Sequence, residues 1–332
     1  MNTARQGMVV YLIDQKTEIR CQRSKTRRQL PTTDLRPLIS EMAFAPLRFN
    51  SFHLPSRRQD FQTKQGIGKL IDLHCHILPG LDDGPSRVEG SLKMAECAVA
   101  DGIHTLVATP HAFNEAYHNP LPHIITHIAS LKKIIVENQI PLDICPGAEV
   151  RIHQGMDRSV KEGKNVSINN TGRYILVEFP HHMIIPGTRD VLFQLFLNGV
   201  TPVLAHPERN LALQRNPDIL SDLVTLGCLV QLTAMSITGE LGLDAMEYSH
   251  FLLKQRQAHV IATDAHNAES RPPILSSAVE VTAHILGDTE AAEAMVTVNP
   301  RTILDGKPLD PPEPTKRSKE TGWRERWFGW IS

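Results

Sequence analysis

From Leu70 onward, short apolar runs alternate with longer amphipathic stretches along the chain. Runs of a few apolar residues predict buried strands, and apolar residues repeated every three or four positions predict helices that cover them. The predicted strands are Leu70–Leu73, Thr105–Ala108, Leu142–Cys145, Tyr174–Phe179, Pro202–Ala205, Leu229–Leu232 and Val260–Ala262. The predicted helices cover residues 87–100, 122–138, 188–198, 216–226, 244–256 and 273–286. One helix start also has a local signal, because Ser86 and Glu89 have the spacing of a capping box.

Strands that alternate with helices in this way indicate an α/β fold with a parallel sheet. Seven such units most simply close into a barrel, and an open doubly wound sheet is the alternative. No G-x-G-x-x-G string follows the first strand, which disfavours the dinucleotide-binding version of the open sheet. We therefore expect one barrel domain over residues 70–305.

The segment 1–69 lacks this pattern and has a different charge. It contains 13 Lys and Arg against 5 Asp and Glu, so we interpret it as a basic, disordered extension. The alternative is that translation begins near Leu70. Nucleic-acid binding is not expected, because no regular interleaving of aromatic and basic residues along the segment supports it. The chain has five cysteines and no C-x-x-C pair, which favours free thiols in a reducing cytoplasm.

The segment 306–332 begins rich in proline and ends with all three tryptophans of the chain. Trp323, Trp327 and Trp330 have the spacing of one helix face, with basic residues beside them. This pattern suits docking on an anionic membrane surface or in a partner's groove, and packing back onto the barrel is the alternative. No apolar run is long enough to span a bilayer. We expect a cytoplasmic protein, with peripheral contact at the inner face of the membrane left open.

Six of the seven predicted strands end in His, Asp or Glu. The carboxyl ends of the strands in a β/α barrel lie on one face, so these groups are expected to converge. Unpaired charges packed together are costly, and divalent cations would offset that cost. Imidazole and carboxylate are ligands of Mn, Fe and Zn. The nine candidate metal ligands are His74, His76, Asp83, His111, Glu149, Glu178, His206, Asp264 and His266. The histidines that follow no strand end are interpreted as surface or rim groups: His118, His123, His127, His181 and His182.

Several strings in these positions resemble motifs of the polymerase and histidinol phosphatase (PHP) superfamily. They are I-D-L-H-C-H-I-L-P-G-L-D-D-G, A-T-P-H, P-G-A-E-V, L-V-E-F-P, L-A-H-P-E-R-N and I-A-T-D-A-H, spread over residues 70–305. The first string is most similar to the branch of bacterial protein-tyrosine phosphatases of the CpsB/YwqE type, which is linked to capsular and exopolysaccharide synthesis. The resemblance implies a distorted, TIM-like (β/α)7 barrel that binds three divalent metal ions, often Mn²⁺, with Fe or Zn as alternatives.

The resemblance also implies how the ligands are shared between the metals. One metal would take His74, His76, Glu149 and Asp264, a second would take Glu149, Glu178 and His206, and a third would take Asp83, His111 and His266. Only the match to the family's motif favours Asp83 over Asp82. Arg209 and Arg271 match the positions of the arginines that bind phosphate in the family, and a guanidinium fork suits phosphate geometry.

The implied activity is that of a phosphoric monoester hydrolase acting on phosphotyrosine through a metal-bridging hydroxide. The implied partner is a phosphotyrosine protein, a bacterial tyrosine kinase of polysaccharide synthesis. A phosphatase of a small phosphomonoester, such as histidinol phosphate or a sugar phosphate, is an alternative. A non-enzymatic, membrane-docked regulatory partner is another. A cysteine-based phosphatase needs Cys-x5-Arg, but the sixth residue after Cys75 is Leu81, which disfavours that mechanism.

Overall fold

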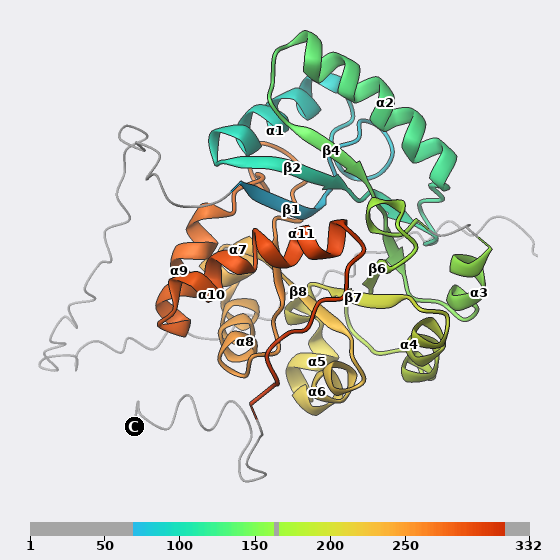
Figure 1. Ribbon diagram of the computed structural model, residues 1–332, viewed down its shortest axis with the longest axis vertical. Helices are drawn as coiled ribbons and strands as arrows, with labels where there is room; N and C mark the ends of the chain where they lie inside the picture. The colour runs from blue at the N-terminus through green and yellow to red at the C-terminus, as the bar shows by residue number, and fades with distance from the viewer. Residues whose placement is uncertain (1–68, 163–165, 316–332) are drawn as a thin grey trace, which may run out of the picture. The chain divides into compact units, whose positions relative to one another are not determined.

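The computed structural model describes residues 69–162 and 166–315 (Figure 1). The predicted basic extension up to residue 68 and the tryptophan-bearing segment 316–332 lie outside these described residues, and the predictions made for them stay predictions. Within the described ranges, no helix is both long enough and apolar enough to cross a membrane.

Parallel strands form the centre of the described chain, and each strand pairs only with parallel neighbours. Three strands form one sheet in the order β1-β2-β4, and six form a second in the order β3-β5-β6-β7-β8-β9. Their bounds are β1 Leu70–Cys75, β2 Ile103–Ala108, β3 His111–Ala112, β4 Asp143–Pro146, β5 Glu149–Arg151, β6 Tyr174–Glu178, β7 Thr201–Ala205, β8 Leu229–Thr233 and β9 Val260–Ala262.

Two of the strands are interrupted and pass from the first sheet to the second. β2 resumes as β3 after Pro110, whose missing N–H cannot join the strand ladder. β4 resumes as β5 after Gly147, where a Cβ would lie 2.6 Å from Val107 Cγ1, so a side chain would not fit. A parallel bridge between Cys75 and Ala265 joins β1 to the chain that follows β9. The nine segments thus form seven strands of a closed, distorted barrel, which confirms the predicted (β/α)7 fold.

Helices surround these strands, as Figure 1 shows. Their bounds are α1 Val88–Ala100, α2 Leu121–Glu137, α3 Met156–Lys161, α4 Thr188–Leu197, α5 Leu211–Arg215, α6 Pro217–Thr225, α7 Ala234–Thr238, α8 Leu243–Lys254, α9 Ser276–Leu286, α10 Thr289–Ala294 and α11 Val298–Leu304, with short 3-10 turns at Ile168–Asn170 and Pro207–Arg209. All six predicted helices are present. The predicted capping box is wrong: α1 starts one residue later, with Arg87 at the N-cap position and no side-chain cap.

The barrel interior is apolar and ends at the metal-ligand candidates. Tyr174 and Leu176 lie on the same face of β6 as Glu178, because alternate residues of a strand share a face. Both belong to a buried cluster that includes Ile303 and Leu304 of α11, which lies near the amino-terminal ends of the strands. The inward face of β6 therefore leads from this buried cluster to Glu178 at the carboxyl end of the strand, in the mouth of the barrel.

The chain after α11 is attached to the amino-terminal end of the barrel. Tyr174, the first residue of β6, donates its hydroxyl to the carbonyl of Lys307 at 2.6 Å and accepts a hydrogen bond from the Leu309 amide at 3.1 Å. The Thr315 amide donates to the carbonyl of Gln255, just after α8. The first part of the predicted proline-rich linker thus lies against the barrel.

Candidate metal centre

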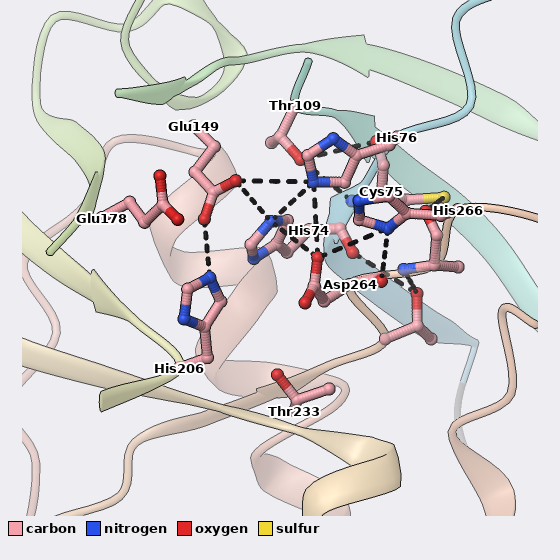
Figure 2. A network of polar contacts seen from close by, with 12 residues as sticks. His74, Cys75, His76, Thr109, Glu149, Glu178, His206, Thr233, Asp264 and His266 are labelled. Atoms are coloured by element: carbon pink, nitrogen blue, oxygen red, sulfur yellow. Dashed lines mark hydrogen bonds and ion pairs between the residues drawn. The ribbon is translucent and has the colours of Figure 1, made fainter. Parts of the chain in front are cut away.

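Four of the predicted ligands form a compact, buried group at the mouth of the barrel (Figure 2). His74 Nε2 and His76 Nε2 lie 3.1 Å apart. Asp264 Oδ1 lies 3.4 Å from the first nitrogen and 3.3 Å from the second. Glu149 Oε2 lies 3.6 Å and 3.5 Å from the same two atoms. Since each of the four residues is at most 2% exposed, these atoms enclose a point shielded from solvent.

Glu149 extends the group toward β6 and β7, because its two oxygens face different histidines. Oε1 lies 2.7 Å from His206 Nε2, whereas Oε2 lies 2.9 Å from His111 Nδ1. The same His111 nitrogen is 3.8 Å from Glu178 Oε2. The two oxygens of Glu149 therefore link two parts of the cluster, one at His206 and one at His111.

A third group lies on the side of His266. Asp83 Oδ1 is 3.3 Å from His266 Nε2 and 3.6 Å from His111 Nε2. The rings of His76 and His266 stack with their centroids 4.0 Å apart. Asp83 is half exposed, so this group opens to solvent. The structure thus brings all nine predicted ligands together, although His76 and His111 each reach more than one of the groups that the resemblance implied.

The donor set fits divalent cations. Glu149 Oε2, Glu178 Oε2 and His111 Nδ1 are buried, and within the described residues they have close ion-pair contacts but no hydrogen bond of good geometry. Two imidazole nitrogens that face each other at 3.1 Å need a proton or a cation between them. Ligand atoms 3.1–3.6 Å apart have the spacing expected around one ion with bonds of about 2.0–2.2 Å. Imidazole and carboxylate without thiolate suit Mn, Fe or Zn.

The charge of each carboxylate in the cluster depends on the charges of the groups beside it. Burial alone would raise the pKa of Glu149, but His74, His111 and His206 hold it well below its usual range. Burial raises the pKa of Glu178, and the nearby Glu149 charge raises it further. Carboxylates in this setting need positive charge beside them, which protons on the histidines or metal ions supply.

Three further side chains hold the ligands in place, and the sequence alone assigned them no role. Asp82 Oδ2 accepts a hydrogen bond from His76 Nδ1 at 2.7 Å, so Asp82 orients a ligand while its neighbour Asp83 faces the cluster. Gln231 Oε1 lies 2.9 Å from His74 Nδ1. Asp72 accepts hydrogen bonds from the Thr263 amide at 3.0 Å and the Thr263 hydroxyl at 2.5 Å, joining β1 to the end of β9. Such partners fix ring orientation at metal sites.

Two ligand positions have strained backbones. His206 has a φ of 32° and Asp264 a φ of 51°, both in the left-handed region that non-glycine residues rarely adopt. The surrounding hydrogen bonds hold them there, including one from the Asp264 amide to the His74 carbonyl at 2.8 Å. Strain of this kind is concentrated at functional sites, where the fold imposes a geometry that the local sequence does not prefer.

Arginines surround the cluster. Arg209 Nη1 and Arg271 Nη2 each lie 2.5 Å from Asp264 Oδ2. Arg151, which the sequence analysis did not select, lies 3.1 Å from Glu178 Oε2 through Nη2. A pocket of about 40 Å³ opens beside Arg209 and is lined by Glu178, Phe179, His181, Ala205, His206, Pro207, Arg209 and Asn210. Guanidinium groups at a cationic centre suit an anionic, phosphate-like ligand.

The five histidines that follow no strand end, and Cys75, are not part of the ligand groups. His118, His123, His181 and His182 are exposed and His127 is partly exposed, so they lie on the surface. Cys75 is fully buried between the two ligands His74 and His76, and burial raises the pKa of its thiol well above the usual value. A thiol in this state is a poor nucleophile, in line with the missing Cys-x5-Arg motif.

A parallel barrel with imidazole and carboxylate groups at the carboxyl ends of its strands has the architecture of a metal-dependent hydrolase. The chain belongs to the CpsB/CapC family of capsular polysaccharide synthesis, whose family model matches residues 70–305. It is 35% identical over 256 residues to the tyrosine-protein phosphatase YwqE of Bacillus subtilis, covering 76% of this chain and all of that protein. It is 33% identical over 242 residues to the tyrosine-protein phosphatase CpsB of Streptococcus pneumoniae, covering 71% of this chain and 98% of that protein.

A solved structure supports the same relationship. The crystal structure of YwqE, reported with CpsB as unique metal-dependent tyrosine phosphatases, matches with a TM-score of 0.71. The match has 35% sequence identity and covers 75% of this chain and 100% of that one. The predicted family resemblance is confirmed.

Proposed function

We propose that this chain is a metal-dependent protein-tyrosine phosphatase that acts on a bacterial tyrosine kinase of capsule or exopolysaccharide synthesis. The observation that carries the proposal is the convergence of nine imidazole and carboxylate groups at the mouth of the barrel, centred on Glu149. The relatives that cover most of the chain are named tyrosine-protein phosphatases, which supports phosphotyrosine as the substrate.

In this proposal the nine ligands hold three divalent ions, with Mn²⁺ as the first choice. Such ions supply a nucleophilic water near neutral pH and neutralise phosphoryl oxygens. Glu149 would contribute one oxygen to each of two positions, since Oε1 faces His206 and Oε2 faces His74, His76 and His111. Asp82 and Gln231 keep the Nε2 atoms of His76 and His74 directed at the cluster.

Arg209 and Arg271 are proposed to bind the phosphoryl group. Both are paired with Asp264 Oδ2 at 2.5 Å, at the edge of the cluster. A phosphate that enters beside Asp264 can accept hydrogen bonds from both guanidinium groups, because each carries several N–H donors. Two fixed cations on one side of the phosphate orient it and stabilise the charge that develops during hydrolysis.

The test is hydrolysis of a phosphotyrosine peptide with Mn²⁺, before and after complete chelation. We expect activity that is lost on chelation and returns with Mn²⁺. Activity that survives complete metal removal would overturn the proposal. Histidinol phosphate and sugar phosphates, assayed in parallel, decide the substrate class: faster turnover of either than of the peptide would favour a small-molecule phosphatase.

The proposed membrane contact has its own test. Removing residues 316–332 takes away Trp323, Trp327 and Trp330 and leaves the described barrel intact. We expect the truncated protein to hydrolyse the peptide at the full-length rate and to lose binding to anionic vesicles. Equal vesicle binding by both forms would exclude the tail as the membrane contact.

A further inference from the structure

Two neighbouring ligands of the cluster have their second ring nitrogens held by different groups. His76 Nδ1 meets the carboxylate of Asp82 at 2.7 Å, whereas His74 Nδ1 meets the amide oxygen of Gln231 at 2.9 Å. Gln231 is fully buried on β8, the one strand of the barrel that the sequence showed without a His, Asp or Glu at its end. β8 thus contributes to the cluster through a neutral side chain.

The state of one imidazole nitrogen determines what the other can bind. A neutral imidazole has one N–H and one lone pair, so an acceptor at Nδ1 places the proton there and leaves Nε2 as the ligand atom. His74 Nε2 is the atom that lies 3.4 Å from Asp264 Oδ1 and 3.6 Å from Glu149 Oε2. An acceptor behind His74 therefore fixes both the tautomer and the plane of the ring toward the cluster.

The fold alone does not favour a glutamine at this position. Gln231 Nε2 is buried and makes no hydrogen bond within the described residues. A buried donor without a partner costs stability, and an apolar side chain of the same shape would avoid that cost. Its neighbour on the same face of β8, Leu229, is part of the apolar barrel interior. The contact with His74 is what distinguishes Gln231 from that interior.

We propose that Gln231 is a positioning residue that raises the metal affinity of the group formed by His74, His76, Glu149 and Asp264. This inference rests on the proposed metal centre. The neutral amide supplies the acceptor without adding a third negative charge beside Glu149 and Asp264. This role requires that the amide oxygen, and not the amide nitrogen, faces His74 Nδ1. If the oxygen is the facing atom, a carboxylate can replace the amide, because a carboxylate is also an acceptor.

Three variants of the full chain separate this role from packing. Gln231→Met keeps the shape and removes the acceptor, and Gln231→Glu keeps an acceptor and has no donor. Gln257→Leu is the matched control, because Gln257 is also buried but donates to Ser221 Oγ, at 2.8 Å, outside the cluster. Circular dichroism checks folding. If Gln231→Met does not fold, Gln231→Asn takes its place. Its side chain is one carbon shorter, so the acceptor lies farther from His74.

The measurement is calorimetric titration of the metal-free proteins with Mn²⁺ alone. We expect Gln231→Met to weaken the affected binding step by about 10–100-fold, Gln231→Glu to stay near wild type, and Gln257→Leu to match wild type. Wild-type affinity in Gln231→Met, or equal weakening in Gln231→Glu and Gln231→Met, would overturn the role of Gln231. If the wild type itself binds no Mn²⁺, the proposed metal centre fails instead.

Discussion

The carboxylate of Asp82 lies 2.7 Å from Nδ1 of His76, on the side of the ring that faces away from the metal-ligand cluster. The same oxygen accepts a hydrogen bond from the His111 amide at 3.0 Å, so one side chain positions two candidate ligands. Asp83, the next residue, instead faces His266 and His111. Two adjacent aspartates therefore have opposite relations to the cluster, one behind a ligand and one among the ligands.

This difference predicts separable effects of Asp82→Ala and Asp83→Ala. Asp83→Ala should lower the number of bound metal ions by one, because it removes a ligand oxygen. Asp82→Ala should keep the number at saturating metal and weaken affinity about 10–100-fold, because His76 loses its orienting partner. Elemental analysis at saturating and limiting Mn²⁺ measures both. Loss of one ion in Asp82→Ala, with full occupancy in Asp83→Ala, would reverse the two assignments.

Removal of the metal ions should destabilise the barrel. Ions that bind only the folded chain stabilise it by about 4 kcal/mol when present at a thousand times their dissociation constant. For a domain of this size that corresponds to a fall in melting temperature of roughly 10 °C on chelation. Thermal denaturation with and without a chelator measures it. Asp264→Asn, which weakens a ligand, should show a smaller difference, and an equal difference would argue against binding at Asp264.

The two arginines beside Asp264 should act mainly on phosphate. We expect Arg209→Ala and Arg271→Ala each to lower kcat/KM for a phosphotyrosine peptide by about 10–100-fold, since a hydrogen bond to a charged group contributes about 1.5–3 kcal/mol. Lysine at either position should recover only part of this loss, because it lacks the planar fork. Steady-state kinetics and metal analysis together check the prediction. Full activity in both alanine variants would place the phosphate elsewhere.

His259 gives the protein a pH dependence of stability unrelated to the metal centre. Its ring is buried, Nδ1 accepts a hydrogen bond from the Val230 amide at 2.9 Å, and burial lowers its pKa from 6.5 to about 4. The unfolded chain therefore binds a proton at a higher pH than the folded chain does. Stability is complete above about pH 6.5 and decreases as the pH falls toward 4, by about 3 kcal/mol in total.

His259→Asn retains an acceptor for the Val230 amide and cannot titrate. Urea denaturation of both proteins between about pH 7 and pH 4 should give a flatter curve for the variant, because all other titrating groups are shared. Parallel curves would show that His259 does not contribute to the acid sensitivity.

Much of the barrel was predictable because each strand carries a run of apolar residues that are buried on both faces. β3 and β5 were not predicted, since they have only two and three residues and consist partly of ligands. The short helices α3, α5, α7, α10 and α11 were missed for a related reason, as five to seven residues are too few to show a helical period. The capping-box prediction was wrong because the spacing of two residues is only a local signal. α1 begins one residue later than that spacing predicts.

The nine candidate ligands were predictable because parallel strands bring their carboxyl ends to one face. Gln231 was not, since a neutral side chain at a strand end gives no signal of metal chemistry. In the sequence, Asp72 and Asp82 are indistinguishable from possible ligands. Their roles follow from the hydrogen bonds of Asp72 to Thr263 and of Asp82 to His76. Orientation of a side chain depends on contacts between distant segments, which one sequence does not reveal.

The two hydrogen bonds between Tyr174 and residues 307–309 hold the chain after α11 at the end of the barrel where the strands begin. Thr315 is held at the end of α8, on the side where the strands begin, whereas Glu178 and Asp264 lie where the strands finish. The last described residue and the mouth of the barrel therefore lie at opposite ends of the strands. As far as Thr315, the chain after α11 thus lies away from that mouth and does not restrict the approach of a substrate.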